Sequence, residues 1–350
     1  MEGLKIGNKR SKYPIIQGGM GVGVSLHKLA GNVSKEGGIG VISMADVGYQ
    51  EEDFNKNPMK ANLRAIGKEI KKAREIAGED KILGANIMVA LQNYAEIVKE
   101  CVKRKIDLII SGEGIPKDLP EYVKGTNTKI APIVSSLRCC QLIVKHWIKK
   151  YDYVPDMIVI EGTEAGGHLG FKKEELQEEN KPKLEDITKE VVDYIKGVEK
   201  EHNKEIPVIA AGGIWDKNDI NKFLDLGADG VQMATRFVTT YECDASEEFK
   251  KAYINAKKED IKIINSPVGM PGRAICNKFI KNTEKEKSKI QKCYKCIKTC
   301  DVLNTPYCIT KALINSVKGN IEDGLIFCGS NVYKAKEIVS VHNLMQELVG

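Results

Sequence analysis

The sequence lacks any hydrophobic run that could cross a membrane, because none of its apolar runs approaches the ~18 consecutive residues that a spanning helix needs. The stretch from Met1 to Pro14 also lacks the apolar core of a secretory signal. We therefore expect a cytoplasmic protein that has no membrane partner.

The sequence has little net charge for its length, since 54 basic residues stand against 48 acidic ones and leave a formal net charge of +6. The two signs are interspersed along most of the chain. A protein that binds nucleic acid usually gathers its basic residues on one face, so we expect no nucleic-acid partner. The one concentrated stretch, Lys278 to Lys298, is typical of a solvated surface segment, and an acidic partner docking there is the alternative.

Short apolar runs and helical segments alternate between Tyr13 and Ala234. Each run is rich in Ile and Val and lacks strict alternation, which is typical of strands buried on both faces of a parallel sheet. Strand followed by helix, eight times over, predicts an α/β fold, a (β/α)8 TIM barrel. The predicted strands are Pro14 to Gln17, Ile39 to Ser43, Ile82 to Met88, Leu108 to Ser111, Ile130 to Val134, Met157 to Glu161, Val208 to Ala211 and Gly230 to Ala234.

The pattern changes after the eighth predicted strand. A Pro- and Gly-rich turn at Ser266 to Gly272 is followed by the lysine-rich stretch and a cysteine cluster. Two further helices are expected, around Thr310 to Val317 and Lys334 to Leu348. We predict a barrel domain over residues 1–246 and a helical extension over residues 247–350, which carries the cysteines and packs on the barrel as a C-terminal cap.

Two glycine-rich loops follow the seventh and eighth predicted strands, at Ala210 to Ile214 and Gly227 to Arg236. In barrels these two loops, with a helix N-terminus, commonly form a phosphate site, because glycines let backbone N–H groups approach the anion. The sequence therefore predicts a phosphate site at this end of the barrel. Two ordinary tight turns are the alternative.

A histidine set among glycines follows the sixth predicted strand, at His168 within Ile160 to Gly170. The carboxyl end of a barrel strand faces the active site, and glycines offer a core histidine little packing. Because histidine titrates near neutral pH, it can take a proton from a carbon acid or return one. We predict a catalytic or substrate-contacting role for His168, with a structural hydrogen bond as the alternative.

The glycine-rich segment Gln17 to Gly23 follows the first predicted strand. It does not fit the dinucleotide-binding fingerprint G-x-G-x-x-G, because Leu26 stands where the third glycine would be. A tight strand-to-helix turn that lets a flat ring lie against the backbone explains these glycines better.

These motifs together resemble a known family. They are Gln17-Gly18-Gly19-Met20, Gly84-Ala85-Asn86, Glu161 to His168, Ala211-Gly212-Gly213-Ile214, Thr235-Arg236-Phe237 and Pro271 to Ala274. The combination resembles the nitronate monooxygenase family, formerly called the 2-nitropropane dioxygenases. It equally resembles the flavin-dependent enoyl-acyl carrier protein reductases, which share the same barrel.

The resemblance implies a barrel that binds FMN. The residues that it implies for the cofactor are Gly18, Gly19, Met20, Asn86, Glu161, Gly166, Gly167, Gly212, Gly213, Gln232, Ala234 and Thr235. Gly19 and Met20 would lie near the isoalloxazine ring, and Asn86 would hydrogen-bond it. Gly212, Gly213, Ala234 and Thr235 would hold the phosphate. The family's usual Gly-Thr pair is Ala234-Thr235 in this chain, which a backbone contact tolerates.

The same resemblance implies a catalytic role for His168. The histidine would remove the proton α to a nitro group, or would lie beside the reacting carbon of an enoyl thioester. A preformed nitronate anion would need no such base.

Four of the ten cysteines gather in one short segment, at Cys293, Cys296, Cys300 and Cys308. In the cytosol, thiols and metal ligands are more common than disulfides. The spacing suits a zinc ion or a [4Fe–4S] cluster, since one loop can wrap its thiolates around a compact centre. A set of reduced thiols under the lysine-rich stretch is the alternative.

The first functional hypothesis is an FMN-dependent oxidoreductase of the nitronate monooxygenase type, which oxidises alkyl nitronates with O2. The alternative is an NAD(P)H-dependent enoyl-acyl carrier protein reductase, for which the lysine-rich stretch could dock the acidic carrier. A non-catalytic flavin or iron–sulfur redox sensor and a flavin-free phosphate-binding lyase or isomerase stay open. The physiological substrate, the nature of the electron acceptor (O2 or another) and the formation of a homodimer also stay open.

Overall fold

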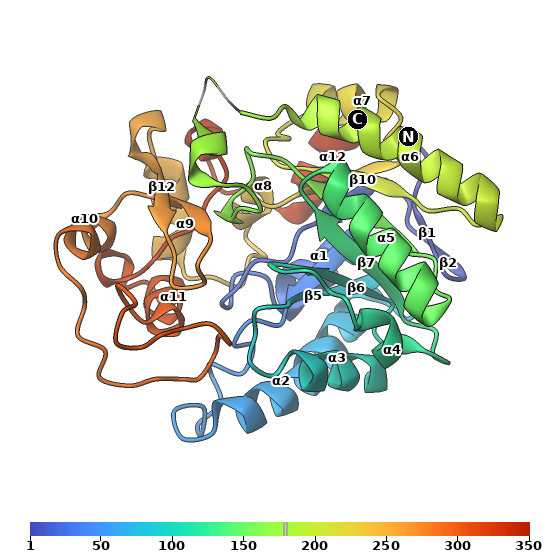
Figure 1. The fold of residues 1–350 in the computed structure, drawn as a ribbon. Helices are drawn as coiled ribbons and strands as arrows, with labels where there is room; N and C mark the ends of the chain where they lie inside the picture. Colours follow the sequence, from blue (N-terminus) through green and yellow to red (C-terminus); the bar gives the residue numbers. More distant parts are fainter. Residues whose placement is uncertain (178, 180) are drawn as a thin grey trace.

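The computed structural model describes residues 1–177, 179 and 181–350, and its centre is a closed barrel of eight parallel strands (Figure 1). The last strand pairs with the first and closes the barrel. Every strand agrees with its predicted run to within one residue at each end, so the predicted (β/α)8 barrel is confirmed. The strands are β3 (Ile15–Gln17), β4 (Ile39–Ser43), β5 (Leu83–Met88), β6 (Leu108–Gly112), β7 (Lys129–Val134), β8 (Ile158–Glu161), β10 (Val208–Ala211) and β11 (Gly230–Met233).

The strands are apolar on both faces because both faces are buried. Inward-facing residues such as Ile16, Val41 and Ile110 pack together inside the barrel. Their chain neighbours, such as Ile15 and Ile42, belong to the larger core between strands and helices. A hairpin of β1 (Lys5–Ile6) and β2 (Lys9–Arg10) adds apolar side chains to the interior cluster. A strand in this environment cannot show polar alternation, which explains the sequence pattern.

Helices follow the strands and cover the outside of the barrel (Figure 1). Side-chain caps fix the starts of two of them: Ser136 accepts a hydrogen bond from the backbone N–H of Cys139, and Asp216 accepts from two backbone N–H groups. No helix among the described residues is long and apolar enough to span a membrane. The helices are α1 (His27–Lys35), α2 (Pro58–Ala77), α3 (Tyr94–Lys103), α4 (Leu119–Val123), α5 (Leu137–Tyr151), α6 (Leu184–His202), α7 (Lys217–Asp225) and α8 (Thr235–Val238).

The chain after α8 forms the predicted helical cap and, in addition, a small antiparallel sheet. Strand β13 (Pro271–Ile275) pairs with β12 (Ile261–Asn265) on one side and with β9 (Gly167–His168) on the other. The sequence did not indicate this sheet, because β9 has only two residues and its partner lies about a hundred positions away. The helices of this part are α9 (Glu247–Asn255), α10 (Lys278–Lys285), α11 (Ile309–Val317) and α12 (Val341–Val349).

The last helix returns to the barrel. Helix α12 packs against α1, α7 and α8, and lies near α7 in Figure 1. Its buried face is made of Val341, Leu344, Met345 and Leu348. The end of the chain therefore completes the ring of helices, while the segment between α8 and α12 extends over the barrel.

We expect Leu344→Ala to destabilise the protein by about 2–5 kcal/mol, because the side chain is fully buried between α12 and the barrel helices. Gln346→Ala, on the exposed face of the same helix, is the matched control and should change the free energy of unfolding little. Chemical denaturation measures both variants. Equal stability of the two variants would contradict the packing described for α12.

Candidate active site

A cavity of about 420 Å³ lies at the carboxyl ends of the barrel strands. This volume is within the range of roughly 300–1,000 Å³ that is typical of small-molecule sites. Every residue predicted to be catalytic or to bind the cofactor lies on the wall of this cavity. These residues are Gly18, Gly19, Met20, Asn86, Glu161, Gly166, Gly167, His168, Gly212, Gly213, Gln232, Ala234 and Thr235. Of the four clustered cysteines, Cys296 also lies there.

The loop after β3 lies directly against β5. A Cβ atom added to Gly19 would be 2.3 Å from the Cβ of Asn86, so only glycine fits at this position. Gln17 is fully buried and joins the loop to β4: its Nε2 donates to the carbonyl of Val41 (3.2 Å), and its Oε1 accepts from the Val41 N–H (3.1 Å). The N–H of Gly18 donates to the carbonyl of Met233 (2.8 Å). The cavity is therefore walled here by backbone and by the Asn86 side chain.

The two loops predicted to hold phosphate lie side by side, and a C-terminal segment covers them. Gly212 and Gly213 have φ angles of +106° and +80°, a conformation that favours glycine. Asn331 Nδ2 donates to the carbonyl of Gly213 (2.6 Å), and the N–H of Gly329 donates to Thr235 Oγ1 (3.1 Å). Residues 329–331 therefore connect the two loops, a role that nothing in their sequence indicated.

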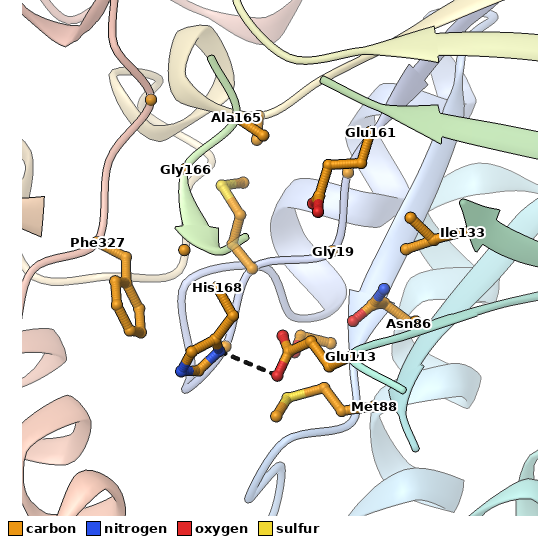
Figure 2. Close-up of a pocket in the computed structure, with 18 of the residues that line it drawn as sticks. Gly19, Asn86, Met88, Glu113, Ile133, Glu161, Ala165, Gly166, His168 and Phe327 are labelled. Atoms are coloured by element: carbon orange, nitrogen blue, oxygen red, sulfur yellow. Dashed lines mark ion pairs between the residues drawn. The ribbon is translucent and has the colours of Figure 1, made fainter. Parts of the chain in front are cut away.

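His168 is buried and held on three sides. Its Nε2 lies 2.6 Å from Ser266 Oγ, and its Nδ1 lies 2.9 Å from Glu113 Oε2 (Figure 2). Its ring packs edge-on against Phe327, with ring centroids 4.9 Å apart. The pairing of β9 with β13 sets the backbone position, because Gly272 lies opposite His168. The histidine thus has a fixed orientation within the cavity.

Sequence reasoning missed the partners of His168. Glu113 carried a usable signal, since it stands between two glycines directly after β6, at the carboxyl end of a barrel strand. Ser266 and Phe327 carried none, because they reach the histidine only through the small sheet and the segment that follows it.

Carboxylates dominate the charge of the cavity. Asp46, Glu113, Glu161 and Glu164 line it, while none of the described lining residues is a lysine or an arginine. Burial, together with the charge of Glu113, raises the pKa of the Glu161 carboxyl from 4.5 to about 8. Glu161 therefore keeps its proton at neutral pH and can donate a hydrogen bond to a bound group. Burial acts to raise the pKa of the Glu164 carboxyl, but its ion pair with Lys181, its hydrogen bond with Ser330 and the charge of Arg273 together lower it.

The four clustered cysteines are the residues predicted to bind a metal ion or a cluster. All ten cysteines are free thiols, and the described residues contain no group of three or more His, Cys, Asp or Glu side chains that could hold a metal ion. Cys293 is exposed, whereas Cys296 lines the cavity and burial raises its pKa to about 12. The zinc or [4Fe–4S] site at Cys293, Cys296, Cys300 and Cys308 therefore stays a prediction.

A closed parallel barrel whose carboxyl ends carry glycine-rich loops and a buried histidine is the architecture of a TIM-barrel enzyme. The family model of nitronate monooxygenase matches residues 4–350, so this chain belongs to the nitronate monooxygenase family and is a flavin-dependent oxidoreductase. A probable nitronate monooxygenase of Staphylococcus saprophyticus is 30% identical over 294 residues, with 77% of each chain covered. One from Staphylococcus aureus strain Newman is 32% identical over 293 residues, again with 77% of each chain covered.

Solved structures share the fold. FabK from Thermotoga maritima has a TM-score of 0.73 at 24% identity, covering 97% of this chain and 92% of its own. Nitroalkane oxidase from Streptomyces ansochromogenes has a TM-score of 0.71 at 19% identity, with 97% and 95% covered. The enoyl reductase domain of MlnA from Bacillus amyloliquefaciens has a TM-score of 0.68 at 14% identity, with 97% and 94% covered. At these identities the similarity supports the barrel fold and nothing finer.

We expect Gly19→Ala to push Asn86 out of place, because the added methyl group has no room beside its Cβ. The variant should lose about 1–3 kcal/mol of stability and most of its bound flavin. Gly197→Ala in α6 is the control, since a Cβ there meets nothing within 4 Å and alanine favours the helix. Thermal unfolding and flavin absorbance check both variants, and full flavin content in Gly19→Ala would contradict this description of the wall.

The raised pKa of Glu161 predicts a pH-dependent stability. The unfolded chain ionises this carboxyl near 4.5 and the folded chain near 8, so stability falls as pH rises between these values, by up to about 1.4 kcal/mol per unit. Glu161→Gln removes this pH-dependent loss of stability. The melting temperature of the variant minus that of the wild type should therefore increase from pH 5 to pH 8. Melting curves at matched flavin occupancy measure the difference. A difference that does not change with pH would show that Glu161 titrates normally.

Proposed function

We propose that this chain is an FMN-dependent oxidoreductase that oxidises alkyl nitronates with O2. One observation carries the proposal: a single cavity has two glycine-rich loops suited to a phosphate at one end and the buried His168–Glu113 pair at the other. The membership of the nitronate monooxygenase family supports the same reaction class.

The residues present fit a phosphorylated flavin. Because no lysine or arginine is found among the described lining residues, the phosphate would depend on backbone N–H groups of Gly212, Gly213 and Ala234 and on Thr235. The ring would lie on the loop of Gly18, Gly19 and Met20, where a side chain on Gly19 is excluded. Asn86 and the protonated Glu161 would hydrogen-bond its polar edge, and Gly166, Gly167 and Gln232 would complete the wall.

A bound flavin would supply the redox chemistry between the substrate and O2. The residues of the chain would orient the substrate and limit the access of water to it. Phe327 packs edge-on against His168, and Glu113 lies 2.9 Å from its Nδ1, so the histidine ring is held in one orientation at the cavity wall.

Reduction of an enoyl thioester by NAD(P)H is the second candidate. An apolar part of the cavity favours it, lined by Leu91, Ile297, Ile309, Leu313 and Leu325. Such a surface suits an acyl chain. The shared fold with the enoyl reductase domain of MlnA is compatible with this activity, and the exposed lysines of the Lys278 to Lys298 stretch could contact an acidic carrier.

Oxygen uptake separates these functions. The FMN-loaded protein should consume O2 when given a primary alkyl nitronate without NADH, and should oxidise NADH no faster than free FMN does. His168→Ala should lower uptake, because the variant loses the group that holds Glu113 and closes the site. NADH oxidation that depends on an enoyl thioester would support the second candidate. Bound flavin without either turnover would indicate a redox sensor, and a protein that takes up no flavin would indicate a lyase or isomerase.

A further inference from the structure

Residues 286–308 form a long segment between α10 and α11 that contains neither a helix nor a strand. All of these residues are described, and only Ile297, Thr305 and Tyr307 among them are buried. Segments of this length without secondary structure are uncommon in a compact fold, because ordering the chain costs entropy that buried contacts must offset. The segment therefore needs a source of stability beyond its few buried side chains.

Backbone contacts place this segment at the wall of the cavity. The N–H of Gln92 donates to the carbonyl of Cys296 (2.9 Å), and the N–H of Lys298 donates to the carbonyl of Ala90 (3.0 Å). Between these two bonds Ile297 is paired with the loop that follows β5. Cys296 and Ile297 both line the cavity. Whatever orders the segment therefore also shapes the cavity.

The four thiols of the cysteine cluster lie near one another. Burial raises the pKa of three of them, and charges nearby add to this effect. The charge of Cys293 acts on Cys300 and on Cys308. Cys296 is affected by the charge of Asp46 and then by those of Cys308 and Cys300. A bound cation relieves such repulsion between neighbouring thiolates.

Backbone N–H groups stand beside the first and the last thiol of the cluster. Lys295 has a φ angle of +54°, which non-glycine residues seldom adopt, and its N–H donates to Cys293 Sγ (3.4 Å). Turns of this kind form anion-binding concavities at many iron–sulfur sites. Cys308 is the N-cap residue of α11, and the backbone N–H of Lys311 acts against the effect of burial on its pKa. Both thiols thus have donors that a metal-bound thiolate would accept.

The charge of residues 286–308 also suits a thiolate centre. The segment has five lysines and two acidic residues. A zinc ion or a [4Fe–4S] cluster bound by four thiolates carries a net negative charge, which nearby lysines stabilise. The lysine-rich stretch then has a role that needs no acidic protein partner. All five lysines are exposed, and they are Lys287, Lys289, Lys292, Lys295 and Lys298.

We propose that the cysteine cluster binds one metal centre through four thiolates, either a zinc ion or a [4Fe–4S] cluster, which holds residues 286–308 against the cavity. The ligands are Cys293, Cys296, Cys300 and Cys308. No three of these side chains converge on one point as the structure describes them. Rotation about χ1 moves a thiol between staggered positions, so the metal would orient the side chains as it binds. Each thiol that binds releases its proton to water, and no electron is transferred.

Metal analysis of the full chain, purified without oxygen and without chelators, tests the proposal. We expect about one zinc ion per chain, or about four iron ions with four acid-labile sulfides and a broad absorption that dithionite bleaches. The first result identifies a zinc site, and the second identifies a cluster. A chain that contains neither, and that takes up neither ZnCl2 nor ferrous iron with sulfide under reducing conditions, would overturn the proposal.

Cys300→Ser removes one ligand and should lower the metal content at least about tenfold. Cys139→Ser is the matched control, because Cys139 is also half-buried but lies in α5, outside the cluster. It should keep the full metal content. Equal metal content in the two variants would mean that the metal is bound elsewhere, which contradicts the proposal.

Trypsin digestion of the wild type covers the case in which Cys300→Ser does not fold. The exposed lysines of residues 286–308 are cleavage sites, and the metal-loaded chain should be cut there at least about tenfold more slowly than the metal-depleted chain. Cleavage after Lys124, which is exposed in the turn that follows α4, is the internal control and should not change. Equal cleavage of residues 286–308 with and without metal would show that no metal centre holds this segment.

Discussion

The short pairing between β9 and β13 is the interaction on which the site depends. Through it, the loop that carries His168 is joined to a segment about a hundred residues later in the chain, with Leu169 donating to the carbonyl of Pro271 (2.9 Å). Arg273 donates to the carbonyl of Ala165, and Cys328 donates to the carbonyl of Arg273. Without this pairing the glycine-rich loop would have few contacts to fix it, since glycines supply no packing. The small sheet therefore gives the loop the rigidity that catalysis needs.

Two groups of residues with different chemistry line the cavity. One end is built from backbone, at Gly212, Gly213 and Thr235, and suits an anion without any cationic side chain. The other end gathers Glu113, Glu161 and His168, where burial decides which carboxyl keeps its proton.

The sequence predicted the barrel well and the site in part. The barrel strands are short, continuous apolar runs without polar alternation, so the local pattern was sufficient to locate them. The glycine-rich loops of the cavity and His168 were also predicted as site residues, because they follow barrel strands directly. Glu113 was missed although it follows β6 in the same way. Ser266, Phe327 and the segment 329–331 could not be found, since only tertiary pairing brings them to the cavity. The cysteine spacing does not fix the direction of the side chains, so the metal site stays a prediction.

The visible absorption spectrum of the purified protein under anaerobic conditions, before and after addition of a nitronate or of NADH, tests the central claim most directly. The account predicts the bands of an oxidised flavin, released as FMN on denaturation, that a nitronate bleaches and NADH leaves unchanged. Bleaching by NADH but not by the nitronate would contradict it, and so would a colourless protein that takes up no FMN.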